Sequence, residues 1–403
     1  DLGPAHIDVG RIAVNYYDKA QGAGLSIEEY GRQAVAEDIG STVQPLDAPQ
    51  DVVLYGFGRI GRLMARILID KTDGGECLRL RAIVVRKGSA PNDLVKRASL
   101  LRRDSVHGAF DGTIRVDEER QSFVANGNEV KVIYADSPDQ VDYTEHGNNN
   151  AIIIDNTGVW RDPEGLALHL QAKGASKVIL TAPGKGDMKN VVAGINNDII
   201  EEDDRIISAA SCTTNAIAPP LKALDDEYGI LSGHVETVHA YTNDQNLIDN
   251  YHKADRRGRS APLNMVITET GAAKAVAKVL PQLAGKLTGN AIRVPTPNVS
   301  MAILNLTLGQ ETTKEALNEY MRNMALHSTM RKQIDYSNSP EVVSTDFVGS
   351  RTACVYDARA TIVNGSQAVV YLWYDNEFGY SCQVHRILEQ MAGIRYATYP
   401  KTA

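Results

Sequence analysis

The chain has 403 residues, of which 43% are hydrophobic and 23% charged, and its formal net charge at pH 7 is −8. This length exceeds what a single hydrophobic core usually holds, so we expect an ordinary globular protein with two domains and an appendage. The negative charge argues against a general role on nucleic acid or anionic membranes, and no apolar run is long enough to span a bilayer.

The four cysteines, Cys77, Cys212, Cys354 and Cys382, form no CxxC pair. Their spacing suggests neither a zinc cage nor a dense disulfide framework, so we expect no metal site. Free cysteines fit a reducing, cytoplasmic location best.

The first 50 residues form a segment of their own. The stretches "RIAVNYYDKAQ" and "SIEEYGRQAVAEDI" predict two short amphipathic helices separated by "GAG", and "GSTVQPLDAPQ" predicts a linker. No pattern there indicates chemistry. We favour an arm for packing or oligomer contact over a regulatory site.

Two further domains follow this arm. Over residues 51–211, apolar runs such as "AIIID" and "KVILTAP" alternate with helical patterns, which indicates a Rossmann-type parallel sheet covered on both faces. Over residues 212–381, strand-like runs such as "VSMAILNLTL" follow one another with few helices between them. They predict an α+β catalytic domain with a largely antiparallel sheet. A helix over residues 382–403 is expected to complete the first domain, and the fold class is α/β.

A glycine-rich turn marks the start of the second segment. In "YGFGRIGR", Gly56, Gly58 and Gly61 have the GxGxxG spacing directly after a strand and at the start of a helix. The first glycine would permit a tight turn, the second the approach of a pyrophosphate, and the third close packing of helix on strand. The pattern predicts a dinucleotide site, with the phosphates at the helix N-terminus.

The end of the next strand bears on the choice of cofactor. An acidic residue there would bind a ribose 2′-hydroxyl, whereas basic residues suit a 2′-phosphate. The chain has Val84 and Val85 followed by Arg86 and Lys87. We therefore favour NADP, or use of both NADP and NAD, although the two charges could simply lie in a solvated loop.

A single cysteine stands in "SAASCTTNAIAPP", before a predicted helix whose start Pro219 and Pro220 are expected to delay or kink. The helix N-terminus would favour a thiolate at Cys212, and His239, at the end of "GHVETVHAYT", could act as its general base. On spacing alone, a buried structural thiol fits Cys212 better than a nucleophile does.

Eight motifs in one fixed order resolve that ambiguity. They are "YGFGRIGR", "RRDSVHGAFDG", "SAASCTTNAIAP", "HAYTNDQ", "HKADRRGR", "TGAAKAVAKVLPQLAGKLTG", "RVPTPNVS" and "WYDNEFGYS". Together they resemble the glyceraldehyde-3-phosphate dehydrogenase family over residues 51 to 395. The N-terminal extension is similar to that of the longer bacterial variants.

The resemblance implies roles for individual residues. It makes Cys212 the nucleophile and His239 the base. It implies a substrate-phosphate pocket of Thr242, Asp244 and Arg293, and an inorganic-phosphate pocket of Ser211, Thr213, Thr270 and Gly271. The implied cofactor contacts are Gly56, Phe57, Gly58, Arg59, Ile60, Gly61, Arg86, Lys87, Thr181, Asn376 and Tyr380.

Three departures from the family pattern surround the expected ribose. Tyr55 stands where the family usually has Asn, Val85 replaces the usual acid, and Asn250–Tyr251 replaces the Leu-Pro of strictly NAD-using members. The absent proline normally packs where a 2′-phosphate would lie. The three departures together favour NADP, or else weakened cofactor binding.

The resemblance implies a phosphorylating glyceraldehyde-3-phosphate dehydrogenase that interconverts glyceraldehyde 3-phosphate and 1,3-bisphosphoglycerate through a cysteine thioester. One alternative is erythrose-4-phosphate dehydrogenase, whose relatives share the "YH" of residues 251–252 but lack the Thr270–Gly271 pair. Another is a non-catalytic regulatory or scaffold paralogue. The expected ligands are the substrate and inorganic phosphate. The resemblance also implies a homotetramer with residues 241–263 at an interface. We expect no binding to membranes or to specific nucleic acid.

Overall fold

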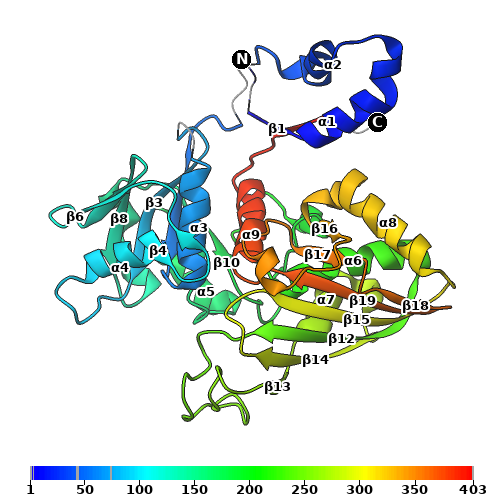
Figure 1. The fold of residues 1–403 in the computed structure, drawn as a ribbon. Helices are drawn as coiled ribbons and strands as arrows, with labels where there is room; N and C mark the ends of the chain where they lie inside the picture. The colour runs from blue at the N-terminus through cyan, green and yellow to red at the C-terminus, as the bar shows by residue number, and fades with distance from the viewer. Residues whose placement is uncertain (1, 3, 42–44, 73–74, 402–403) are drawn as a thin grey trace.

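The computed structural model describes residues 2, 4–41, 45–72 and 75–401. Figure 1 shows a small arm above two larger domains that lie side by side. One domain is built on a parallel sheet and the other on a mixed, mostly antiparallel sheet, which confirms the predicted fold class.

The first domain contains an eight-stranded sheet in the order β11-β10-β9-β2-β3-β8-β7-β6. The six strands from β11 to β8 are parallel, and β7 and β6 extend the sheet as an antiparallel hairpin. Their bounds are β2 (Gln50–Tyr55), β3 (Leu78–Val85), β6 (Ile114–Asp117), β7 (Ser122–Ala125), β8 (Asn128–Tyr134), β9 (Ala151–Asp155), β10 (Ala175–Leu180) and β11 (Ile206–Ser208).

Helices cover both faces of this sheet, because its central strands are apolar on both sides. Strand β9 is buried at every position. The helices are α3 (Arg59–Asp70), α4 (Asp93–Arg102), α5 (Pro163–Gln171) and, from the far end of the chain, α9 (Phe378–Met391). A two-stranded ladder of β4 (Arg103–Asp104) and β5 (Gly108–Ala109) follows α4.

The second domain has the strand order β13-β14-β12-β15-β19-β17-β16, with β18 beside β19. Two of its pairs, β12–β14 and β16–β17, are parallel, and the others are antiparallel. The strands are β12 (Ile230–Ala240), β13 (Val266–Glu269), β14 (Leu287–Val294), β15 (Ser300–Leu308), β16 (Ile334–Ser337), β17 (Cys354–Asp357), β18 (Ile362–Asn364) and β19 (Gln367–Tyr374).

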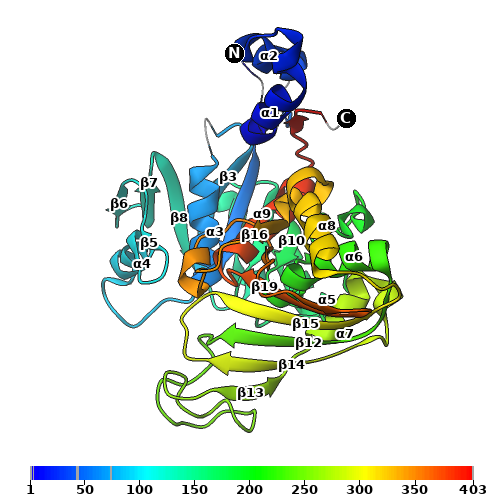
Figure 2. The ribbon, with the colours of Figure 1, turned by 45° about the vertical axis from the view of Figure 1, so that its right-hand side comes forward.

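One face of this second sheet is covered by α6 (Cys212–Tyr228), α7 (Ala272–Val279) and α8 (Lys314–His327), as Figure 2 shows. Alternate residues of β15, such as Leu304 and Leu306, are buried in the core that these helices form with the sheet, whereas Asn305 between them is exposed. This period of two is typical of a sheet with one buried face.

Helix α6 begins at Cys212 and runs without a break through Pro219 and Pro220, so the expected delay of its start is wrong. Two prolines remove the N–H groups that would bond to the carbonyls of Asn215 and Ala216. Both rings are buried, and the neighbouring Ile217 and Leu221 belong to the apolar core of the second domain. Tertiary packing therefore outweighs the loss of two helical hydrogen bonds.

The helix expected over residues 382–403 is also corrected. Helix α9 begins earlier, at Phe378, and ends at Met391. Gly393 adopts a φ of +80°, and the N–H of Ile394 donates to the carbonyl of Glu389, which is the hydrogen bond of a Schellman C-cap. Beyond it the chain becomes the short strand β20 (Ala397–Tyr399).

Where the N-terminal arm is described, its α-helices are α1 (Val9–Asn15) and α2 (Ile27–Ala34), and the second starts with a capping box made by Ser26 and Glu29. Before α1 lies a strand that the sequence patterns did not indicate. This strand, β1 (Ala5–Ile7), pairs in parallel with β20 and so joins the arm to the segment that follows α9.

An ionic cluster joins two helices that cover the first sheet. The Arg59 guanidinium donates to the carboxylates of Asp104 and Glu377, and Glu377 also lies 3.1 Å from Nε2 of His107. Although burial alone would raise it, backbone N–H groups of His107 and Val106 and the charge of Arg59 lower the pKa of Asp104 to about 2. The cluster ties the start of α3 to the start of α9.

Gly61 is expected to tolerate no side chain. A Cβ at this helical position would lie 2.4 Å from the carbonyl oxygen of Gly56, a backbone atom of the turn. We expect Gly61→Ala to cost about 2 kcal/mol and to lower the melting temperature by several degrees. Gly31→Ala in α2 is the matched control, because a Cβ at Gly31 would meet nothing within 4 Å. Equal melting temperatures for Gly61→Ala and the wild type would contradict this account.

The ionic cluster predicts a pH-dependent stability. Because the pKa of Asp104 is lower in the folded protein than in the unfolded chain, its contribution is complete above pH 4 and is lost as the pH falls towards 2. We expect Arg59→Gln to lower stability at pH 7 by about 1 kcal/mol and the difference to shrink below about pH 4. Melting curves from pH 7 to pH 3, with exposed Arg115→Gln as control, measure this. A pH-independent difference would rule out the ionic origin.

Candidate active site

The candidate nucleophile lies where α6 begins. Cys212 is the first residue of the helix, and the Ser211 hydroxyl caps it by accepting a hydrogen bond of 3.0 Å from the N–H of Thr214. The preceding Ala210 adopts a φ of +55°, which turns the chain sharply from β11 into the helix. As a whole residue Cys212 is partly exposed, whereas Cys354 and Cys382 are buried. A reactive role for Cys212 therefore stays a prediction, which its place at the start of α6 favours.

The structure brings Cys212 and His239 together: Sγ lies 3.5 Å from Nε2. His239 is the penultimate residue of β12 and is 5% exposed. Arg293 stands directly beside it, because β12 and β14 pair in parallel with His239 opposite Arg293. Three residues that are far apart in the sequence thus meet at one edge of the sheet.

Nδ1 of His239 has two competing neighbours. The carbonyl oxygen of Ala240, which can only accept, and Nη1 of Arg293, which can only donate, each lie 2.7 Å away. Nη1 also donates to the Ala240 carbonyl at 3.0 Å. If Arg293 moves away, Nδ1–H can donate to Ala240, and this tautomer leaves Nε2 free to accept a proton from Cys212.

In this arrangement the pair is uncharged at neutral pH. Burial, followed by the charge of Arg293, lowers the pKa of His239 to about 3. Burial also raises the pKa of Cys212, against the opposing effects of Arg293 and of hydrogen bonds from Thr213 and the helix N-terminus. The helix N-terminus therefore acts in the predicted direction but does not by itself produce a thiolate.

A second arginine, missed in the sequence analysis, completes a cationic site. Arg257 lies 2.5 Å from the carboxylate of Asp244, which also accepts a hydrogen bond from the Thr242 hydroxyl. Nε of Arg257 and Nε of Arg293 are both buried without a hydrogen-bond partner among the described residues. Unpaired buried donors of this kind are costly, and an oxygen-rich anion would satisfy them.

The expected inorganic-phosphate residues are not all free to bind. The Thr213 hydroxyl lies 3.1 Å from that of Tyr374, which in turn lies 2.7 Å from Thr237. Ser211 is engaged in capping. Thr270 accepts a hydrogen bond of 3.2 Å from the N–H of Ala272 and, with Gly271, precedes α7. No described hydrogen bond joins Thr270 or Gly271 to Cys212, His239 or Arg293.

The glycine turn has the shape that a pyrophosphate needs. Gly58 is exposed, a Cβ there would meet nothing within 4 Å, and no side chain caps the start of α3. The first N–H groups of the helix, including those of Arg59 and Ile60, are thus available. Phe57 is buried near the ring of Phe123. The side chain of Arg59 is committed to the ionic cluster, so it can contribute only its backbone.

Hydrogen bonds within the protein hold the side chains of Asn376 and Tyr380 in place. Ser300 donates to Oδ1 of Asn376 at 2.8 Å and accepts from the N–H of Ala240 at 3.0 Å, so the amide nitrogen of Asn376 stays available. The hydroxyl of Tyr380 donates to the Ala210 carbonyl at 2.9 Å and supports the turn before Cys212. The hydroxyl of Thr181 donates to the Asp155 carbonyl at the end of β9.

The region expected to hold the ribose contains an unpaired cation. Arg86 is exposed and has no ion pair among the residues described. Lys87 lies 5.7 Å from the centre of the Tyr134 ring. Tyr55 is buried against His169 and Trp160, so it cannot replace the family Asn as a polar ligand.

Within the described ranges, no three His, Cys, Asp or Glu side chains are grouped so as to hold a metal ion. In the same ranges, no helix has the length and apolar character that crossing a membrane requires.

The candidate functional residues that were not expected from the sequence all lie inside the motifs that carry the resemblance. Arg257 is in "HKADRRGR", Ser300 ends "RVPTPNVS", and Tyr374 is in "WYDNEFGYS". Nothing local distinguishes them from their neighbours. Their partners, Asp244, Asn376 and Thr213, come from other parts of the chain and are visible only in three dimensions.

Comparison with known proteins agrees with this geometry. Residues 50–163 match the family model described as the NAD binding domain of glyceraldehyde 3-phosphate dehydrogenase, and residues 211–376 match that of its C-terminal domain. A glyceraldehyde-3-phosphate dehydrogenase-like protein of Pseudomonas aeruginosa is 64% identical over 400 residues, covering 99% of this chain and 86% of that protein.

Two more distant relatives come from a plant and from another bacterium. Chloroplastic glyceraldehyde-3-phosphate dehydrogenase A of Zea mays is 41% identical, over 89% of this chain and 87% of its own. Glyceraldehyde-3-phosphate dehydrogenase of Streptococcus pyogenes is 41% identical, over 85% of this chain and 98% of its own. With both domains matched and these identities over most of its length, the chain belongs to the glyceraldehyde-3-phosphate dehydrogenase family.

Proposed function

We propose that the protein is a phosphorylating glyceraldehyde-3-phosphate dehydrogenase that uses NADP, or both NADP and NAD. The observation that carries this proposal is the meeting of Cys212, His239 and Arg293, with unpaired Nε donors on Arg293 and Arg257. A nucleophile and base beside two unsatisfied arginines suit an aldehyde that carries a phosphate.

Binding of the substrate phosphate prepares the base. The phosphate draws Arg293 away from His239 and neutralises the charge of the arginine. Burial and then Arg293 hold the pKa of His239 at about 3, so this pKa rises when the phosphate binds. Nδ1–H then donates to Ala240, and Nε2 faces the thiol. Arg293, Thr242 and Asp244 form the substrate-phosphate site, and Arg257 is added to it.

The reaction then proceeds on the cysteine. Nε2 of His239 takes the thiol proton as Sγ bonds to the aldehyde carbon, and the resulting alkoxide accepts hydrogen bonds from Nε2–H and the Cys212 N–H. A bound nicotinamide supplies the hydride acceptor. Loss of hydride from this carbon leaves a thioester, and an oxygen of inorganic phosphate attacks it. The C–S bond breaks, and Cys212 regains its electron pair.

The remaining expected residues serve the second phosphate and the cofactor. Ser211, Thr213, Thr270 and Gly271 are proposed to bind inorganic phosphate, which requires Thr213 to exchange its contact with Tyr374. The first amides of α3 bind the pyrophosphate, the free amide nitrogen of Asn376 holds the nicotinamide carboxamide, and Arg86 with Lys87 faces the 2′-phosphate. Thr181 and Tyr380 support these contacts through their hydrogen bonds to the backbone carbonyls of Asp155 and Ala210.

We also propose a cytoplasmic homotetramer. Five apolar side chains from residues 247 to 265 are at least 74% exposed in the single chain: Leu247, Ile248, Tyr251, Leu263 and Met265. An apolar surface of this kind usually marks a protein interface. The four free cysteines agree with a reducing compartment.

The activity is tested with Cys212→Ser and His239→Gln. We expect wild type to oxidise glyceraldehyde 3-phosphate with NADP only when inorganic phosphate is present. Cys212→Ser should abolish turnover, and His239→Gln should reduce kcat by about 10²–10⁴-fold. Cys77→Ser, a partly exposed cysteine elsewhere, is the control. A higher kcat/KM for erythrose 4-phosphate would identify the alternative enzyme, and no turnover of either aldehyde would identify a scaffold paralogue.

The cofactor proposal is tested separately with Arg86→Asp. Removing the cation and adding a repelling carboxylate should raise the Kd for NADP by about tenfold or more, since a charge-assisted hydrogen bond is worth roughly 1.5–3 kcal/mol. The Kd for NAD should stay the same or fall. Calorimetric titration of both cofactors, with the exposed Arg115→Asp on β6 as control, measures the difference. An unchanged preference would show that Arg86 does not contact the 2′-phosphate.

A further inference from the structure

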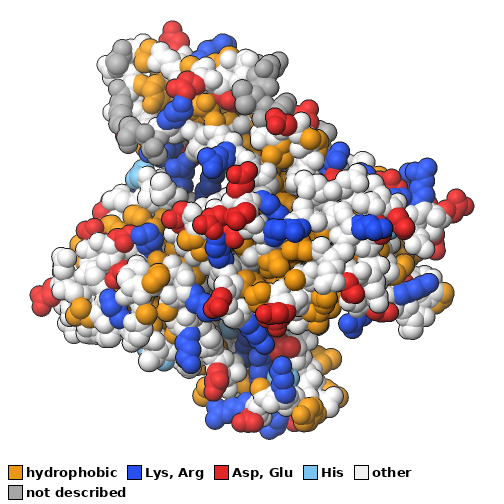
Figure 3. Space-filling view, turned by 180° about the vertical axis from the view of Figure 1, so that it is seen from behind, with side chains coloured by type: hydrophobic (Ala, Val, Ile, Leu, Met, Phe, Trp, Pro, Cys, Tyr) orange, Lys and Arg blue, Asp and Glu red, His pale blue; other side chains and the backbone are white. Residues whose placement is uncertain are grey.

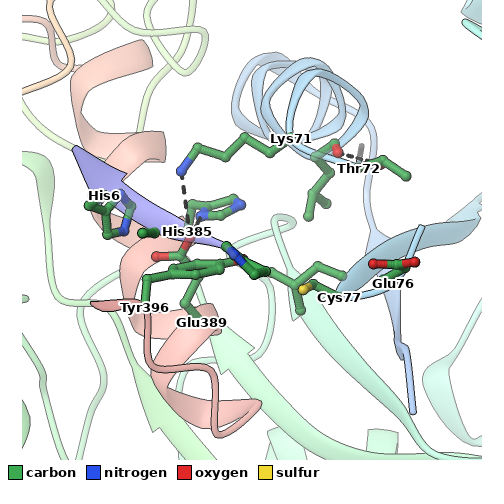
Figure 4. Close-up of a pocket in the computed structure, with 12 residues that line it drawn as sticks. His6, Lys71, Thr72, Glu76, Cys77, His385, Glu389 and Tyr396 are labelled. Carbon is green, nitrogen blue, oxygen red and sulfur yellow. Dashed lines mark hydrogen bonds and ion pairs between the residues drawn. The ribbon is translucent and has the colours of Figure 1, made fainter. Parts of the chain in front are cut away.

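Two adjoining cavities lie where the arm meets the first domain. The first, of about 260 Å³, is bounded by β1, the C-terminal end of α3 and the last turns of α9, as Figure 4 shows. The second, of about 340 Å³, opens beside it, and the two share His6, Lys71 and Glu389. Their combined size falls within the range of ligand pockets.

This pair of cavities is distinct from the dinucleotide site. Lys71 caps the C-terminal end of α3, whereas Gly58 caps its N-terminal end. The helix has 12 residues, so the two ends are about 18 Å apart. A ligand in the cavities at the arm would therefore not occupy the pyrophosphate position at Gly58.

The second cavity carries an excess of positive charge. Lys71, Lys332 and Arg386 line it, and Glu389 is its one carboxylate. Glu389 lies 3.5 Å from Lys71, whereas Lys332 has no ion pair among the described side chains. Figure 3 shows Lys and Arg side chains gathered in the hollow between the arm and the rest of the molecule. Such a concentration of cations favours a multivalent anion.

Two buried polar groups in these cavities lack partners. His385, which is 2% exposed, has Nδ1 at 3.3 Å from Glu389, but its Nε2 has no hydrogen-bond partner among the described residues. Within the same ranges, the side-chain oxygen of Gln333 is also unpaired, in a residue that is 4% exposed. Buried polar groups are normally satisfied, so these two indicate a ligand that has polar atoms of its own.

The first cavity adds rings and apolar surface to the charged side chains of Lys71, Glu76 and Glu389. His6 and Tyr396 meet edge to face with their centroids 5.0 Å apart, and Leu68 and Leu78 line the same space. Burial, followed by the charge of Lys332, lowers the pKa of His6 to about 4, so its ring is uncharged at neutral pH. A flat aromatic group can pack against such neighbours.

We propose that the junction of the arm and the first domain binds a nucleoside polyphosphate. Its phosphates lie against Lys332, Arg386 and Lys71, and its base occupies the ring-lined cavity beside His6 and Tyr396. The unpaired groups of His385 and Gln333 form hydrogen bonds with the base and the sugar. The arm thereby becomes one wall of a ligand site, which differs from the packing role that its sequence suggested.

Cys77 provides a site-specific readout, because it lines the first cavity and is partly exposed. The full chain is treated with N-ethylmaleimide, and the modification rates of Cys77 and Cys212 are followed separately by peptide mass spectrometry. Free ATP at about ten times its Kd should slow modification of Cys77 by about tenfold. Cys212 in the same sample reports any effect at the catalytic site.

Lys332→Gln should raise the ATP concentration needed for protection by about tenfold, because a charge-assisted contact is lost. Lys71→Gln is a second variant if the first does not fold, and Lys173→Gln, an exposed lysine of the first domain, is the control. Adenosine and tripolyphosphate, tested alone, should each protect less than ATP.

Three results would overturn the proposal. One is no protection of Cys77 by ATP in the wild type. Another is that ATP protects Cys77 in Lys332→Gln or in Lys71→Gln as well as it does in the wild type. The third is equal protection by tripolyphosphate and ATP, which would remove the base from the ring-lined cavity.

Discussion

The parallel pairing of β12 with β14 is the constraint on which the candidate active site depends. It places His239 and Arg293 opposite each other, and α6 brings Cys212 to the same edge of the sheet. A slip of one residue in this register would turn one of the two side chains to the other face. The chemistry therefore rests on backbone hydrogen bonds as much as on the reacting groups.

Buried hydroxyl groups extend this constraint towards the first domain. Ser300 connects the backbone of Ala240, next to the imidazole, to the amide of Asn376. Tyr374 links the start of α6 to β12 through Thr213 and Thr237. Such networks are rigid when every member is satisfied. A shift in the segment that contains Asn376 would thus be felt at the imidazole of His239, which Tyr374 of the same segment also meets edge to face, with ring centroids 6.0 Å apart.

Local patterns predicted the elements whose causes are local. The glycine turn before α3 acts within a few residues, so its spacing was informative. The end of α9 also has a local cause, because Gly393 takes the positive φ that is typical of the residue after a helix. In contrast, the continuity of α6 through Pro219 and Pro220 depends on packing from other elements, and no sequence window contains it.

The candidate site required long-range information from the start. Spacing alone could not bring His239 to Cys212, and it favoured a structural thiol; only the resemblance made the pair an expectation. The resemblance did not indicate that Arg293 contacts the imidazole of His239, or that Arg257 pairs with Asp244. Unsatisfied donors are a property of the folded arrangement, because an arginine has no orphan nitrogen until its surroundings are fixed.

The pairing of β1 with β20 also affects the order in which the molecule assembles. Strands Ala5–Ile7 and Ala397–Tyr399 are neighbours in space but lie at opposite ends of the described chain. During synthesis the earlier strand leaves the ribosome long before its partner exists, while the domains between them can fold as units. Docking of the arm is consequently a closing event, and its completion reports that everything between the two strands has been made.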